Sequence, residues 1–154
     1  MRVWRITIQS YPDKLSGVGG IYVAGRWHHV GHRIIYTSST ASLAALEYLV
    51  HVDPSLAPSD IGILQIDVPD DIDIEECDPS TLTTKWQQYY PSPKELQDSG
   101  TIWLREKRTA ILAVPSAIMP IEKNYLINPE HAAMSRITVI NEIPFSFDPR
   151  LLSH

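Results

Sequence analysis

Three residues in the first third of the chain could act together on a ligand. Arg26 precedes Trp27, Tyr36 ends a short apolar run, and Glu47 lies in a long apolar stretch. An arginine offers a planar fork for anions, a tyrosine ring offers a stacking surface, and a carboxylate stabilises a developing cation. These parts suit a ligand that carries phosphates, an aromatic ring and a centre that becomes positive.

The surroundings of Glu47 predict that its carboxylate is buried. Residues 40–50 contain no other charged side chain, and on a helical wheel Glu47 shares its side with Leu43 and Leu46. A helix that is apolar nearly all round is expected to be buried, and a lone buried carboxylate is costly without a partner. The sequence indicates Arg26 as that partner.

Ser116 is a fourth candidate, because it follows a predicted buried strand within a Pro-Ser turn. Such a serine either donates a hydrogen bond into a pocket or caps the segment that follows, and the sequence leaves both interpretations open. No Gly-x-Ser-x-Gly motif surrounds it, so a serine-hydrolase role is a rival hypothesis without motif support.

Two further groups of side chains are weaker candidates. The spacing of His28, His29 and His32 resembles that of metal ligands, but no helix or nearby carboxylate organises them, so a solvated turn is favoured and no metal is expected. The single cysteine, Cys77, lies among acidic residues, which should raise the pKa of its thiol and disfavour a nucleophile.

Length and composition point to one globular domain. The chain has 154 residues, of which 44% are hydrophobic and 20% charged, and its net charge is −5. This acidic charge argues against a broad nucleic-acid-binding face. A lone cysteine fits a reducing compartment, no apolar run has the length of a membrane span, and the start is too polar for a signal peptide, so the cytoplasm is the expected location.

Hydrophobic patterning predicts the elements that must position these side chains. We expect a loop over 9–20, an extended piece over 21–27, and a long connection over 69–93 with a turn near Trp86. Two helices are predicted: one capped by Ser38, Ser39 or Thr40 and ending near His51, and one over 93–107, interrupted at Ser99-Gly100. Strands are predicted over 2–8, 33–38, 61–68, 109–114, 124–127 and 136–145.

This order favours an α+β fold in a single domain, 1–154, with a bent or split mixed sheet. A doubly wound parallel sheet would need strands and helices that alternate throughout the chain. Here only two substantial helices are predicted, and the strands cluster towards the end.

The stretch GRWHHVGHRIIYTSSTASLAALE, residues 25–47, resembles the signature of the RES-domain toxins. The resemblance continues in the family's order with WL at 103–104, AVPSAI at 113–118, NYLINPEH at 124–131 and PFSFDPRL at 144–151. The Arg, Glu and Ser that give the family its name correspond to Arg26, Glu47 and Ser116, and its pocket tyrosine corresponds to Tyr36. One departure is His28, where the usual motif, Gly-Gly-Arg-Trp-Asn, has asparagine.

The resemblance implies the toxin of a bacterial type II toxin–antitoxin pair. It implies a fold similar to that of ADP-ribosyltransferases, in which a split sheet holds NAD+ as the substrate without a metal. Family members break NAD+ down by hydrolysis or phosphorolysis, or transfer ADP-ribose to a protein, and the sequence does not choose among these reactions. The implied partner is an antitoxin with an Xre-type helix-turn-helix domain, in a complex that could be oligomeric.

In this reading Glu47 stabilises the positive ribose, Arg26 clamps phosphate or ribose oxygens, Tyr36 flanks the nicotinamide ring, and Ser116 orients ribose or amide. A rival of another class is a non-catalytic subunit that only binds an antitoxin within a DNA-binding complex. In that case the partner would supply the basic surface, since this chain is acidic.

Overall fold

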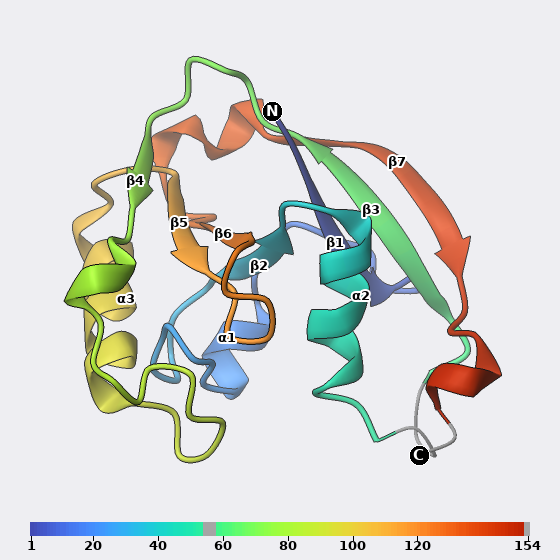
Figure 1. Cartoon of the computed structure of the whole chain (residues 1–154). Helices are drawn as coiled ribbons and strands as arrows, with labels where there is room; N and C mark the ends of the chain where they lie inside the picture. The colour runs from blue at the N-terminus through green and yellow to red at the C-terminus, as the bar shows by residue number, and fades with distance from the viewer. Residues whose placement is uncertain (54–57, 153–154) are drawn as a thin grey trace.

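The structure, a computed structural model, describes residues 1–53 and 58–152. Within these residues seven strands form one mixed sheet in the order β4-β5-β6-β2-β1-β3-β7 (Figure 1). The β4–β5 pair is parallel, and the other pairs are antiparallel. The strands are β1 (Arg2–Ile8), β2 (Ile35–Ser38), β3 (Ile61–Asp67), β4 (Ile74–Glu76), β5 (Ile111–Pro115), β6 (Lys123–Ile127) and β7 (Thr138–Phe145). The α-helices are α1 (Gly19–Tyr22), α2 (Ala41–Leu49) and α3 (Lys94–Glu106), and short 3-10 turns lie at Pro79–Thr81, Ala132–Arg136 and Pro149–Leu151.

The sheet is split between β1 and β2. These strands pair at one position only, Trp4 with Ser38, whereas β1 pairs with β3 along its whole length. Beside the split, Arg5 Nη1 donates a hydrogen bond of 3.2 Å to the Tyr36 carbonyl oxygen. β2, β5 and β6 therefore diverge from β1, β3 and β7 in Figure 1, and the predicted split mixed sheet in one domain is confirmed.

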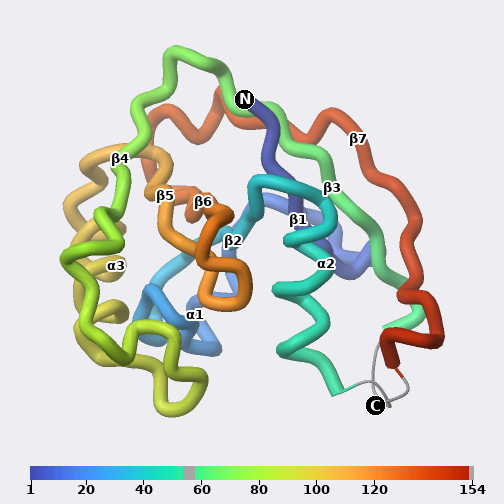
Figure 2. The backbone as a smooth tube through the Cα atoms, viewed as in Figure 1, coloured from blue at the N-terminus to red at the C-terminus, as the bar shows by residue number. Residues whose placement is uncertain are grey.

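Each half of the sheet carries one helix. α3 packs on β5 and β6 through Leu96 and Trp103, whereas α2 packs on the β1–β3–β7 half through Tyr48 and Leu49. Figure 2 shows the chain passing directly from β2 into α2. β7 lies beside β3 and forms one edge of the sheet, and β4 forms the other edge. Side chains on the other face of the sheet form a separate core that includes Val3, Ile35, Leu64, Ile66, Ile111 and Ile127.

Helix α3 is continuous from Lys94 to Glu106, so the predicted interruption at Ser99-Gly100 is wrong. A Cβ atom at Gly100 would lie 1.9 Å from the Trp27 carbonyl oxygen. The glycine is therefore needed for the close approach of the loop that carries Trp27, and it does not break the helix.

Helix α2 begins as predicted but is less buried than predicted. The Thr40 side chain accepts a hydrogen bond of 3.1 Å from the Leu43 backbone N–H and caps the helix. The helix ends at Leu49, two residues before the predicted end. Only Leu43 and Ala44 are buried along it, and Leu46 is 38% exposed, so the apolar sequence forms a half-exposed helix.

Besides the 3-10 turns, one short α-helix and one short strand were not predicted from the sequence. α1 replaces the end of the predicted loop 9–20 and the start of the predicted extended piece 21–27. β4 lies within the predicted loop 69–93 and extends the sheet beside β5. Elements of three or four residues are too short to show a hydrophobic period. The turn expected near Trp86 is present. The backbone N–H of Trp86 donates a hydrogen bond of 3.1 Å to the Thr83 carbonyl oxygen.

Across residues 1–53 and 58–152, every helix is too short or too polar to cross a lipid bilayer.

Candidate functional site

The carboxylate of Glu47 is held through one of its two oxygen atoms. Oε1 accepts a hydrogen bond of 2.7 Å from Ser116 Oγ and another of 2.5 Å from Asn124 Nδ2. Oε2 has no hydrogen-bond partner among the residues that the structure describes. The side chain of this half-buried residue is thus fixed at one oxygen, and the other oxygen remains available as an acceptor.

Ser116 lies directly after β5 and is fully buried. Its hydroxyl oxygen accepts hydrogen bonds from the backbone N–H groups of Ile118 and Met119, at 3.2 and 3.0 Å. The hydroxyl proton is donated to Glu47. Ser116 therefore both caps the turn and donates a hydrogen bond, which were the two alternatives left open by the sequence. In this structure the donation goes to Glu47.

Asn124 is a site residue that our sequence reasoning missed. It lies in β6 opposite Ser38, whose hydroxyl donates a hydrogen bond of 2.8 Å to Asn124 Oδ1. Asn124 belongs to the motif NYLINPEH, but a polar residue near the start of a strand is common on its own. Only the register between β2 and β6 brings it next to Glu47.

Arg26 does not contact Glu47, so the direct pair predicted from the sequence is absent. Its Nη1 atom instead donates to the carbonyl oxygens of Trp86 and Gln88, at 2.7 and 2.9 Å. Burial lowers the pKa of Arg26, while the charge of Glu47 acts to raise it. Arg26 and Glu47 are thus close enough for their charges to interact, and the Nε and Nη2 atoms of Arg26 make no hydrogen bond to a described residue.

Residues 86–89 contact Arg26 and also residues close in the chain to Ser116 and Glu47. The Gln87 side chain donates a hydrogen bond of 3.1 Å to the carbonyl oxygen of Ala117, next to Ser116. The ring of Tyr89 lies 6.3 Å from that of His51, just beyond the helix that carries Glu47. The long connection predicted over 69–93 therefore reaches the candidate site.

The hydroxyl group of Tyr36 is fully used within the protein. It accepts a hydrogen bond of 3.2 Å from the Trp27 N–H and lies 2.8 Å from His28 Nδ1. Because that nitrogen accepts from the Gly25 N–H at 3.1 Å, the tyrosine must be the donor. Burial of the hydroxyl raises the pKa of Tyr36, so the group stays neutral. The half-buried side chain can therefore offer a ligand its ring but no free hydroxyl.

The three histidines of the 28–32 turn have separate environments. His28 is buried against Tyr36, so it is not part of a solvated turn. His29 Nε2 pairs with Asp98 at 2.6 Å, and His32 lines a surface cavity. Within the described ranges, no three His, Cys, Asp or Glu side chains come together as metal ligands would. For Cys77, burial and then the charges of Asp78 and Glu75 raise the thiol pKa, as expected.

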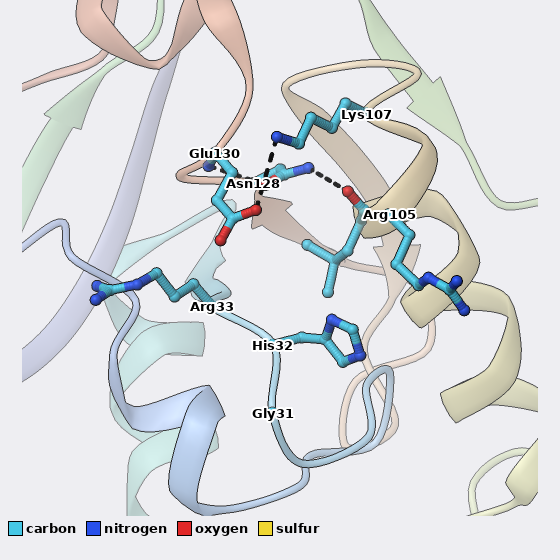
Figure 3. A pocket seen from close by; sticks show the side chains of 8 residues that line it. Gly31, His32, Arg33, Arg105, Lys107, Asn128 and Glu130 are labelled. Carbon is cyan, nitrogen blue, oxygen red and sulfur yellow. Dashed lines mark hydrogen bonds and ion pairs between the residues drawn. The ribbon is translucent and has the colours of Figure 1, made fainter.

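The cavity beside His32 has a volume of about 370 Å³ and does not include the candidate residues (Figure 3). It lies between the end of α3 and the segments before β2 and after β6. Arg33 and Arg105 extend in opposite directions, and Lys107 pairs with Glu130 at 3.7 Å (Figure 3). The cationic groups around it do not converge, so this cavity lacks the features of an anion site.

Comparisons with known proteins agree on one family. The family model described as RES domain matches residues 2–148. A protein named Toxin Res from Yersinia enterocolitica serotype O:8 / biotype 1B is 37% identical over 153 residues, which cover 98% of this chain and 99% of that protein. A protein named Prs ADP-ribosylating toxin from Sphingobium sp. (strain YBL2) is 35% identical over 154 residues, which cover 97% of this chain and 95% of the relative.

A solved structure extends the comparison to the fold. It is the crystal structure of the M. tuberculosis MbcT–MbcA toxin–antitoxin complex, which matches with a TM-score of 0.75 and 17% sequence identity. The match covers 98% of this chain and 86% of that chain. At this identity the likeness concerns the fold alone.

Proposed function

The chain belongs to the RES domain family, and from this membership we propose that it is the toxin of a toxin–antitoxin pair and cleaves the nicotinamide–ribose bond of NAD+. The observation that carries the proposal is the Glu47 carboxylate, which is fixed through Oε1 and has Oε2 available, within the electrostatic reach of Arg26. We further propose that residues 1–154 form a single domain of this family.

The reaction needs a negative charge next to the ribose. Cleavage passes through an oxocarbenium-like transition state, and a preorganised carboxylate stabilises it as in glycoside hydrolysis. Glu47 Oε2 would face this charge or bind a ribose hydroxyl. The nicotinamide leaves as a neutral molecule, so the step does not require a metal. Water as the acceptor yields ADP-ribose and a proton, and phosphate yields phosphorylated ADP-ribose.

Arg26 and Tyr36 would bind the rest of the nucleotide. Both hydrogens of Arg26 Nη1 are donated to the 86–88 segment, which leaves the Nε and Nη2 edge of the guanidinium for phosphate oxygens. The Tyr36 ring would flank the nicotinamide. Ser116 is buried and donates to Glu47, so we assign it to the positioning of that carboxylate and no longer to a direct contact with ribose or amide.

A second candidate is the transfer of ADP-ribose from NAD+ to a protein. The name of the relative from Sphingobium, an ADP-ribosylating toxin, favours it. The same residues would bind NAD+ and stabilise the same charge, and only the acceptor differs.

The proposed partner is an antitoxin with an Xre-type helix-turn-helix domain, and the structural neighbour comes from a toxin–antitoxin complex. We further propose a cytoplasmic location and an oligomeric complex in which the antitoxin, and not this acidic chain, contacts DNA.

The test is NAD+ consumption by the purified chain, free of any partner, with and without phosphate. We expect loss of NAD+ and release of nicotinamide, and a phosphate requirement would identify phosphorolysis. The Glu47→Gln variant keeps the shape and removes the charge, so it should consume no NAD+, whereas the exposed control Glu95→Gln should match the wild type. If NAD+ persists, labelled NAD+ and cell lysate test transfer. A chain inactive in both assays would contradict the proposal and favour the non-catalytic rival.

A further inference from the structure

We propose that Asn124 is a positioning residue for Glu47 and that Ser38 supports it. The inference rests on the proposed function, because it concerns the same carboxylate. It begins from the chain of hydrogen bonds that runs from Ser38 Oγ to Asn124 Oδ1, and from Asn124 Nδ2 to Glu47 Oε1.

The donors and acceptors in this chain fit only one arrangement. An ionised carboxylate accepts hydrogen bonds and donates none, so the amide nitrogen of Asn124 must face Glu47. The amide oxygen then faces Ser38, whose hydroxyl is able to donate. Ser38 is 3% exposed, so water cannot easily take its place. The amide of Asn124 is therefore held at both ends.

Asn124 and Ser116 approach Glu47 from neighbouring strands. Asn124 is paired with Val114 in the β5–β6 register, and Ser116 follows one residue after the end of β5. Because two donors from different strands meet at one oxygen, displacement of the carboxylate would break two hydrogen bonds. The pair thus fixes the position of the carboxylate and leaves its second oxygen without either donor.

The first test is kinetic. The Asn124→Ala variant should lower kcat by about 10²-fold with little change in KM, because a displaced carboxylate stabilises the transition state less while nucleotide binding through Arg26 remains. Ser38→Ala should have a smaller effect in the same direction.

The second test measures how NAD+ turnover depends on pH. A variant that was only less stable would not change the pKa seen in this profile. In the Asn124→Asp variant, the introduced carboxyl can replace the amide as a donor only while it is protonated. When it ionises, two negative groups face each other at hydrogen-bond distance, so the upper pKa of the pair should rise by at least about one unit. Activity should therefore fall as the pH rises through this pKa, which the wild type should not show. Arg26, the nearby cation, is unchanged. Asn141→Asp, at an exposed position of β7, is the matched control.

Carbon-13 NMR titration of the Glu47 carboxyl measures the pKa directly and does not depend on NAD+ turnover. A raised pKa in Asn124→Asp, and none in Asn141→Asp, is the expected result. If Glu47→Gln abolishes NAD+ loss but the Asn124 variants keep wild-type kinetics and titration, this inference is wrong and the proposed function stands. If the wild type does not act on NAD+, the function is wrong, and the titration still decides whether Asn124 contacts Glu47.

Discussion

Glu47 and Ser116 are 69 positions apart in the chain and are joined by a hydrogen bond of 2.7 Å from the serine hydroxyl to Oε1 of the carboxylate. The same hydroxyl oxygen receives two backbone N–H groups, and the residue is fully buried. A serine in this position has no access to an external carbonyl group. The arrangement therefore speaks against a serine hydrolase that uses Ser116, and it makes the serine a support for Glu47.

Replacement of Ser116 by alanine should affect both stability and activity. The variant removes the acceptor of two part-buried N–H groups and one of the two donors to Glu47 Oε1, which should cost about 1–3 kcal/mol of unfolding free energy. NAD+ turnover should fall by about 10- to 100-fold, since Glu47 keeps only Asn124. Chemical denaturation and NAD+ assays check this, with the exposed Ser80→Ala as the control. Wild-type turnover in Ser116→Ala would refute the supporting role.

Replacement of Arg26 by lysine should loosen the 86–88 segment. The lysine side chain is one bond shorter, so its ammonium cannot occupy the position of Nη1, which donates to the carbonyl oxygens of Trp86 and Gln88. Amide hydrogen exchange in this segment should rise by about tenfold or more, equivalent to about 1.4 kcal/mol. Nucleotide affinity should fall in the same variant. Arg105→Lys, at an exposed position of α3, should change neither quantity, and unaltered exchange in Arg26→Lys would argue against the contact.

An alanine at position 100 should displace the loop that carries Arg26. The added Cβ would collide with the backbone of Trp27, so α3 or the loop must move. We expect a loss of about 1–3 kcal/mol in unfolding free energy, together with lower NAD+ turnover. Gly19→Ala is the matched control, because a Cβ there meets no atom within 4 Å. Equal melting temperatures for the two variants would contradict this packing.

Burial of His28 should make the protein less stable in mild acid. Burial lowers the pKa of His28, and the charges of His32 and His29 act in the same direction. Below about pH 6.5 the unfolded chain binds a proton that the folded chain does not, so unfolding free energy falls as the pH falls. The slope from this group approaches about 1.4 kcal/mol per pH unit. His28→Asn keeps an acceptor for Tyr36 and should show a shallower slope between pH 6.5 and 5; equal slopes would exclude the effect.

Strands with strong alternation or dense β-branched residues could be predicted from the sequence, and so could the capped start of α2. β1 and β3 fall within a residue of their predicted bounds, because their apolar residues extend over whole elements. The continuity of α3 could not be predicted, because a glycine inside a helix looks like an interruption until its close neighbour is known. Trp27 is that neighbour, and it is distant in sequence.

The four candidate side chains were identified from the sequence, but their contacts were not. The nearest opposite charge suggested Arg26 as the partner of Glu47, whereas the structure supplies two neutral donors. Asn124 was missed because its position depends on the register between β2 and β6, which no local pattern encodes.

The split between β1 and β2 gives Glu47 a mechanical role. The helix that carries it packs on one half of the sheet, while its two hydrogen-bond donors belong to the other half. Among the described residues, backbone pairing joins the halves at Trp4 and Ser38 alone, so the hydrogen bonds of Glu47 act as a further cross-link over the split, beside the bond from Arg5 to the Tyr36 carbonyl oxygen. A ligand that competes for this carboxylate would loosen the cross-link. The stiffness of the sheet, and not only the chemistry of the site, would then change when the site is occupied.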